Sequence, residues 1–150
     1  MNERERLKKI IIDLSYEKRK VTLASGRESD FYFDGKQTTL HPEGGYLTGK
    51  LFFEAIKDVT GIEGVGGLTL GADPIATATS VVSFLEGRPI PAFIIRKEPK
   101  GHGTSAWLEG RKNLRPGAKV VIVEDVVTTG GSSLKAVARA AEEGLEVLGM

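Results

Sequence analysis

The sequence contains no cysteine among its 150 residues and no long hydrophobic run. The absence of cysteine excludes disulfide bonds and thiolate metal sites, and it fits a reducing compartment such as the cytosol. No stretch of about 18 apolar residues exists to span a bilayer, and charged residues follow Met1 in place of a signal peptide. We therefore expect a cytoplasmic protein without a membrane segment.

The sequence also has no large excess of charge of one sign, because 21 Lys and Arg residues nearly balance 20 Asp and Glu residues. The formal net charge of +1 gives no general attraction to nucleic acid or to an anionic membrane, so any positive field must be local. We expect no nucleic-acid or membrane partner. The length is typical of one domain, and we expect residues 1–150 to form a single unit.

Apolar spacing in the N-terminal third predicts two helices and a hairpin. The first is an amphipathic helix over residues 3–20, and a Ser-Gly turn between two strand-like runs predicts a hairpin over residues 21–34. After a loop at residues 41–45, a second helix is predicted with a buried stripe every fourth residue. That stripe comprises Leu47, Leu51, Ala55 and Val59. His41 falls in the loop, where a structural role is expected rather than a metal-binding one.

Strand-like runs alternate with helical patterns in the rest of the chain. The runs lie at residues 64–68, 91–95, 120–123 and 145–150. Asp73 is predicted to cap a helix whose first residue is Pro74. This alternation predicts an α/β fold with a central, mainly parallel sheet flanked by helices, in which ligands bind at the carboxyl ends of the strands.

The most informative stretch is VVIVEDVVTTGGSS at residues 120–133. Its β-branched run predicts a strand buried on both faces, and Glu124 and Asp125 follow where that strand ends. Glycines and hydroxyls then lead into a helix predicted from the spacing of apolar residues: Leu134, Val137, Ala138 and Ala141. Glycine allows close backbone approach and a helix start offers free N–H groups, so this stretch predicts a phosphate cup below two carboxylates.

Two common nucleotide-binding motifs are absent. The sequence has no GxxxxGK[ST], and Thr69 stands where GxGxxG would need its last glycine. The cup and the acid pair instead suit a sugar phosphate, whose vicinal hydroxyls can donate hydrogen bonds to Glu124 and Asp125.

Residues 96–112 form a long segment with little apolar periodicity, which in a compact domain is usually functional. It concentrates basic side chains between glycines that can act as hinges: Arg96, Lys97, Lys100, His102, Arg111 and Lys112. The composition predicts a cationic lid that closes over an anion.

The stretch VVIVEDVVTTGGS resembles the phosphoribosyl-diphosphate (PRPP) binding motif of the type I phosphoribosyltransferases. Two further segments, TLASGRESDFYFD and RKEPKGHGT followed by LEG, resemble the orotate phosphoribosyltransferase family, and the likeness covers essentially the whole chain. The resemblance implies the type I phosphoribosyltransferase fold with a small N-terminal hood. It divides the chain into an N-terminal helix and hood at residues 1–40 and a core at residues 41–150.

The resemblance also implies a reaction, the Mg²⁺-dependent transfer of phosphoribose from PRPP to orotate in de novo pyrimidine biosynthesis. Orotidine 5′-monophosphate and diphosphate would be the products. The implied catalytic residues are Lys100, His102, Asp125 and Glu124. The implied PRPP-binding residues are Arg96, Lys97, Lys100, His102, Glu124, Asp125, Val126, Val127, Thr128, Thr129, Gly130, Gly131 and Ser132.

Orotate would be held by Thr128, Tyr32 and Phe33, the last two belonging to the hood over the base. The loop at residues 71–74 corresponds to the diphosphate loop of the family. Mg²⁺ is expected on PRPP and water rather than on direct protein ligands. By likeness to the family, the protein would be a homodimer whose mobile loop reaches the neighbouring site.

This reaction needs carboxylates near a ribose that gains positive charge and cations near the departing diphosphate. Both groups are present. Two departures from the family pattern stand out: Ala24 replaces a lysine found in some members, and the pattern continues past Met150 with an arginine for the orotate carboxylate. The chain is therefore expected either to be truncated or to lack part of its base site. The alternatives are transfer to a purine or another base, and a PRPP-binding regulator without catalysis.

Overall fold

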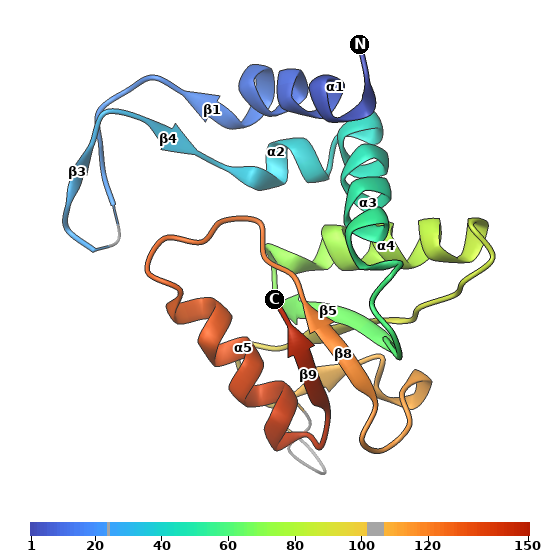
Figure 1. The fold of residues 1–150 in the computed structure, drawn as a ribbon. Helices are drawn as coiled ribbons and strands as arrows, with labels where there is room; N and C mark the ends of the chain where they lie inside the picture. Colours follow the sequence, from blue (N-terminus) through green and yellow to red (C-terminus); the bar gives the residue numbers. More distant parts are fainter. Residues whose placement is uncertain (24, 102–106) are drawn as a thin grey trace.

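The computed structural model describes residues 1–23, 25–101 and 107–150. Its central sheet has the strand order β7-β6-β5-β8-β9 (Figure 1). The strands are β5 (Gly64–Leu68), β6 (Ala92–Ile95), β7 (Leu108–Glu109), β8 (Lys119–Ile122) and β9 (Glu146–Gly149). All neighbours pair in parallel except β7, which runs antiparallel to β6. The predicted α/β class with a mainly parallel sheet is confirmed.

Strand β8 shows why this sheet is covered on both faces. Successive side chains of a strand point to opposite faces. Accordingly, Val120 and Ile122 join one buried cluster with Ala136 of helix α5 (Gly131–Glu142). Val121 and Val123 join another cluster on the opposite face, to which helices α3 (Pro42–Ile56) and α4 (Ala72–Leu85) contribute. The prediction of a strand buried on both faces is confirmed.

The N-terminal segment forms a ribbon that extends from a helix beside α3 (Figure 1). It consists of α1 (Glu3–Ile10), a π-helical turn η1 (Ile11–Ser15), and four short strands: β1 (Tyr16–Glu17), β2 (Val21–Thr22), β3 (Glu28–Ser29) and β4 (Tyr32–Phe33). Strand β1 pairs with β4 and β2 pairs with β3, both antiparallel. The predicted hairpin is confirmed, and its pairing extends beyond the predicted range.

The predicted helix over residues 3–20 is too long. The chain leaves the helix at Tyr16, whose extended backbone pairs with Phe33. At the junction, Asp34 N–H donates to the Ser15 carbonyl, and the buried Ser15 and Thr38 hydroxyls lie 2.6 Å apart. These tertiary bonds, which helical periodicity does not reveal, end the helix at Ser15.

Two helices begin earlier than predicted. Helix α3 begins at Pro42 within the expected loop, because His41 acts as its N-cap and its Nδ1 accepts from Gly44 N–H at 3.2 Å. Helix α4 begins at Ala72, so Asp73 lies in the first turn instead of capping it. There, Asp73 Oδ2 accepts a hydrogen bond from Thr69 Oγ1 at 2.7 Å.

The predicted apolar faces of two helices are only partly correct. In α5 the buried residues are Ser133, Ala136 and Ala140, whereas Leu134 is 71% exposed. In α3 Leu47 is buried as predicted, but Val59 lies beyond the helix and is exposed. Small residues form the buried face of α5, whereas the buried face of α3 combines Leu47 and Phe53 with small residues.

The segment at residues 96–112, predicted as a long loop, ends in regular secondary structure. It contains β7 and a 3₁₀ turn, η2 (Arg111–Asn113). No helix of the described ranges is long and apolar enough to cross a membrane.

Candidate functional site

The acid pair lies where two loops meet at the carboxyl ends of adjacent strands. Glu124 and Asp125 follow β8, and the loop that leads to α4 follows the neighbouring β5. A Cβ atom at Gly71 would lie 2.2 Å from Asp125 Oδ1 and 2.9 Å from Glu124 Oε1. Only glycine therefore lets the loop after β5 approach both carboxylates this closely.

The two carboxylates influence each other. The pKa of Glu124 is raised from 4.5 to about 6. Burial is the largest cause, followed by a side-chain hydrogen bond with Asp125 and by the negative charge of Asp125. The Asp125 backbone N–H donates to Glu124 Oε1 at 3.2 Å, and the positive charge of Lys36 opposes the rise. Glu124 is thus a carboxyl group that changes charge at a higher pH than an ordinary glutamate, as is typical of functional sites.

The predicted phosphate cup is an exposed loop that opens helix α5. Gly130 is the N-cap residue, with a left-handed φ of 82°, and no side chain of the described residues caps the helix. The first N–H groups of α5 are therefore open to an anion, as helix geometry dictates. Val126, Val127, Thr128 and Thr129 are also exposed. The structure brings this cup next to the acid pair, as predicted.

The basic residues after β6 lie near the loop that follows β5. Together they line a cavity of about 550 Å³. Its lining residues are Thr69, Asp73, Ile94, Arg96, Lys97, Glu98 and Glu109. The predicted diphosphate residues Arg96 and Lys97 therefore share one cavity with the predicted diphosphate loop.

Glu109 of β7 holds two of the predicted cations. Its carboxylate accepts from Arg96 Nη1 at 2.9 Å and from Lys100 Nζ at 3.0 Å. Hydrogen bonds first from Lys100 and then from Arg96 keep the pKa of Glu109 below its usual value. His102 lies outside the described residues, and so does Ala24.

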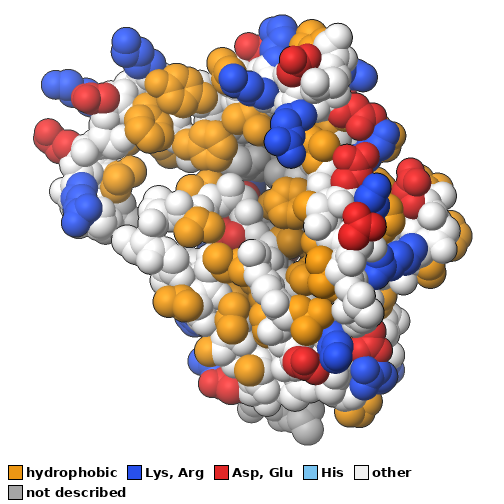
Figure 2. Space-filling model, viewed as in Figure 1, with side chains coloured by type: hydrophobic (Ala, Val, Ile, Leu, Met, Phe, Trp, Pro, Cys, Tyr) orange, Lys and Arg blue, Asp and Glu red, His pale blue; other side chains and the backbone are white. Residues whose placement is uncertain are grey.

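The predicted hood residues differ in their surroundings. Phe33 lines a cavity of about 120 Å³ together with Glu124 and Asp125. Tyr32 is covered instead by the guanidinium of Arg19, which lies 4.5 Å from the ring centroid. Figure 2 shows hydrophobic side chains gathered over the hood and again over the lower part of the molecule formed by the sheet and α5. Phe33 thus shares a cavity with the acid pair, whereas the Tyr32 ring stacks with Arg19.

Sequence reasoning missed two residues at this site. Lys36 belongs to the short helix α2 (Gly35–Thr39) and lies near the acid pair. Glu109 binds the predicted lid cations Arg96 and Lys100. The motif LEG contains Glu109, but no sequence pattern marked Lys36 as a neighbour of the site. Asp73, in the predicted diphosphate loop, carries a buried Oδ1 atom that has no hydrogen-bond partner among the described residues.

Within residues 1–23, 25–101 and 107–150, no group of three or more His, Cys, Asp or Glu side chains could hold a metal ion. The acid pair and Asp73 are nevertheless oxygen donors of the kind that Mg²⁺ prefers. A metal that arrives on a polyphosphate would meet suitable oxygen atoms here.

Comparison with known proteins identifies the family. The chain is 50% identical over 149 residues to the orotate phosphoribosyltransferase of Sorangium cellulosum, and the match covers 99% of this chain and 78% of that protein. No family model matches the chain.

Solved structures agree. The orotate phosphoribosyltransferase of Mycobacterium tuberculosis H37Rv in complex with Fe(III) dicitrate superimposes with a TM-score of 0.84 at 43% identity, covering 99% of this chain and 81% of that one. The same enzyme in complex with PRPP gives a TM-score of 0.78 at 40% identity, covering 99% and 80%. With an acid pair, a phosphate cup and a diphosphate-type loop on an α/β sheet, the chain belongs to the orotate phosphoribosyltransferase family and has the type I phosphoribosyltransferase fold.

Proposed function

We propose that this protein transfers the phosphoribosyl group of PRPP to orotate, giving orotidine 5′-monophosphate and diphosphate, in de novo pyrimidine biosynthesis in the cytoplasm. One observation carries the proposal: the acid pair, followed by an uncapped helix start, lies in contact with the loop after β5. A relative that is 50% identical over 149 residues is an orotate phosphoribosyltransferase.

The donor sugar is held by the stretch after β8. Residues 128–132 bind the 5-phosphate with backbone N–H groups and hydroxyls, while Val126 and Val127 complete the loop. Glu124 and Asp125 accept hydrogen bonds from the ribose hydroxyls. As the bond from C1 to the diphosphate oxygen breaks, the ribose ring gains positive charge that these carboxylates stabilise.

The leaving group is held by cations on the other side of the acid pair. Arg96 and Lys97 line the cavity beside the loop after β5 and bind the diphosphate. Lys100 and His102 close over it, exclude water and supply charge or a proton as it departs. Lys100 must first leave Glu109 to do so.

The acceptor base lies between the cup and the hood. Thr128 and the hood residues Tyr32 and Phe33 hold orotate, and Phe33 shares a cavity with the acid pair. Residues 1–40 thus form the N-terminal helix and hood, and residues 41–150 form the core, within a single phosphoribosyltransferase domain.

Mg²⁺ is the cofactor, held by oxygens of PRPP and by water rather than by a protein cage. The Glu124 and Asp125 carboxylates are hard oxygen donors that can face such an ion across water. When bound, the ion neutralises charge on the diphosphate.

The protein acts as a homodimer, with the loop of one subunit reaching the site of the other. The support comes from large apolar side chains exposed on or near α4: Leu40, Leu70, Val81, Phe84 and Leu85. Large exposed apolar side chains of this kind are typical of a protein interface.

An assay of orotidine 5′-monophosphate formation from orotate, PRPP and Mg²⁺ tests the reaction, with hypoxanthine, guanine and uracil as competing acceptors. We expect turnover with orotate alone. Turnover with a purine would favour the other-base alternative, and PRPP binding without turnover would favour a regulator.

A further inference from the structure

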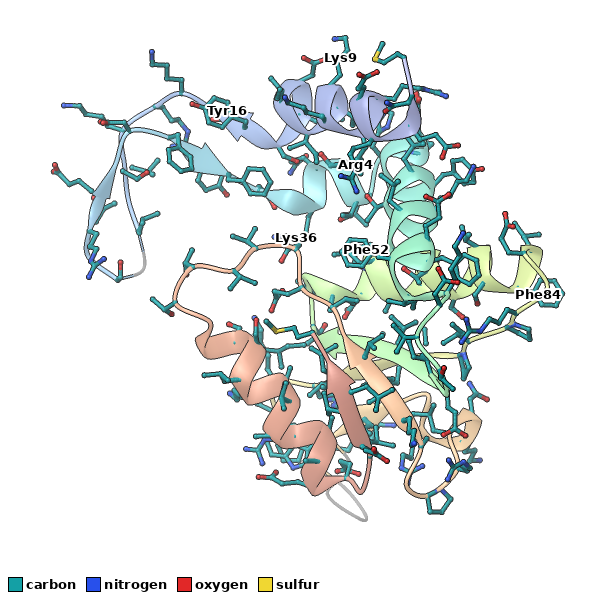
Figure 3. All side chains as sticks on the ribbon, viewed as in Figure 1. Arg4, Lys9, Tyr16, Lys36, Phe52 and Phe84 are labelled. Atoms are coloured by element: carbon teal, nitrogen blue, oxygen red, sulfur yellow. The ribbon has the colours of Figure 1, made fainter. Side chains whose placement is uncertain are left out.

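Lys36 is a cation that the proposed mechanism does not use. It is the second residue of α2, the short helix that follows the hood strand β4 in the chain. Its Nζ lies 2.9 Å from Asp34 Oδ1, and its side chain is 40% exposed. In Figure 3 the labelled Lys36 extends from α2 toward the loop that follows β8. The ammonium group therefore lies between the hood and the substrate loops of the core.

The first turn of α2 packs against the acid pair. A Cβ atom at Gly35 would lie 3.0 Å from both Asp125 Cβ and Asp125 Oδ2. Asp125 also helps to raise the pKa of Lys36, after the hydrogen bond and charge of Asp34, so Lys36 stays protonated at neutral pH. Lys36 therefore brings a fixed positive charge beside the acid pair.

Lys36 also faces the loop after β5. Together they line a cavity of about 520 Å³. The lining residues are Lys36, Thr39, Leu40, Leu70, Asp73, Pro74, Thr77 and Ala78. Lys36 is the cationic side chain of that lining, and this loop carries no lysine or arginine of its own between Thr69 and Pro74. An anion against the loop would thus obtain charge from Arg96 and Lys97 on one side and from Lys36 on the other.

We propose that Lys36 is a PRPP-binding residue whose ammonium group binds the diphosphate moiety, reaching it from the hood across the loop after β5. The inference rests on the proposed function, because the diphosphate is the group that this function places beside that loop. Asp34 is the positioning residue, since it accepts from Lys36 Nζ and caps α2 through Lys36 N–H at 3.1 Å. Binding of PRPP would draw the ammonium group from Asp34 toward the substrate.

The test compares ligands that differ by the diphosphate. Binding of PRPP and of ribose 5-phosphate, each with Mg²⁺, is measured by calorimetry for the wild type, Lys36→Met and Lys36→Arg. We expect Lys36→Met to weaken PRPP binding about tenfold to a hundredfold, as for loss of a charged hydrogen bond, and to leave ribose 5-phosphate binding unchanged. Lys36→Arg should recover part of the loss.

A matched control is Lys9→Met, which removes a lysine that is also paired with an aspartate. Lys9 Nζ lies 2.5 Å from Asp13 Oδ2 on the outer face of the N-terminal helix. This variant should bind both ligands as the wild type does.

Two results would overturn the inference. One is PRPP binding by Lys36→Met that equals the wild type. The other is an equal loss of binding affinity for PRPP and for ribose 5-phosphate, which would indicate that Lys36 has a structural role. Selective loss of orotidine 5′-monophosphate over uridine 5′-monophosphate binding, with PRPP binding intact, would instead place Lys36 on the orotate carboxylate. Failure of the wild type to bind PRPP at all would contradict the proposed function itself.

Discussion

Glu109 Oε2 lies 3.0 Å from Lys100 Nζ, so a carboxylate of β7 holds a cation of the predicted lid. The other oxygen of the same carboxylate holds Arg96 at 2.9 Å. Both cations are expected to bind diphosphate. Glu109 therefore competes with the substrate for them.

Replacing Glu109 with Gln should tighten PRPP binding. The competing charge disappears while the shape remains, and because the pairs are exposed we expect a modest decrease in KM for PRPP, up to about fivefold. Steady-state kinetics with varied PRPP measures it. Glu63→Gln is the control, because Glu63 also pairs with an arginine, Arg115, but precedes β5 at the amino ends of the strands. A higher KM in Glu109→Gln would mean that Glu109 orients the cations instead of competing for them.

Replacing Glu124 with Gln should stabilise the fold at pH 7.5. The folded-state pKa of Glu124, about 6, lies above its usual 4.5. Its contribution to the free energy of unfolding is therefore full below pH 4.5 and is lost as the pH rises through 6. We expect a gain of about 1 kcal/mol at pH 7.5, after allowing for solvent screening of this partly exposed group.

Urea unfolding at pH 4.5 and pH 7.5 measures this gain, which should be absent at the lower pH. Glu63 provides a contrast of opposite sign, because hydrogen bonds from Arg115 lower its pKa. Its contribution is present above the usual pKa and lost as the pH falls, so Glu63→Gln should destabilise the fold at pH 7.5. A Glu124→Gln variant that is less stable at pH 7.5 would contradict the prediction.

Replacing Gly71 with Ala should impair PRPP binding. Gly71 does not have a positive φ, so alanine causes no backbone strain there, but its Cβ would overlap Asp125 Oδ1. We expect a stability cost of about 1–3 kcal/mol from overpacking and a large rise in KM for PRPP as the carboxylates move. Gly149→Ala is the control, since a Cβ at Gly149 meets nothing within 4 Å. Unchanged PRPP kinetics in Gly71→Ala would show that the acid pair tolerates displacement.

Mixing two inactive variants tests whether the lid acts in trans. Lys100→Ala should lower kcat by about 100-fold or more with a smaller effect on PRPP binding, and Asp125→Asn should also impair turnover. If each site uses the loop of the other subunit, a re-equilibrated equal mixture should recover about a quarter of wild-type activity, because half the dimers are mixed and each has one intact site. No recovery in a mixture shown to exchange subunits would indicate sites complete within one chain.

The donor half of the site could be predicted from local sequence. A β-branched run, two acids and a glycine-rich helix start form one continuous segment, so Glu124, Asp125 and the cup needed no knowledge of tertiary contacts. The family resemblance then supplied the acceptor and the roles of the basic residues.

The rest depended on contacts between distant segments. Lys36 was missed because its position depends on the pairing of β1 with β4, which ends the first helix at Ser15 and places α2 against Asp125. Strand β7 was missed because two residues carry no periodic signal, and only pairing with β6 defines it. Asp73 was assigned to a cap because its residue type favours that position, whereas the helical backbone already begins at Gly71 (φ −59°, ψ −41°) and α4 starts at Ala72.

The ribbon formed by β1 to β4 shares no strand pairing with the central sheet among the described residues. The fold therefore separates two tasks that evolution or an engineer could vary independently. Substitutions in the ribbon could change which base is accepted while the sheet, with its cup and acid pair, continues to bind the same activated sugar. Helix α2 packs directly against the acid pair at Gly35, so exchange of acceptor specificity should be constrained most strongly at Gly35 and Lys36.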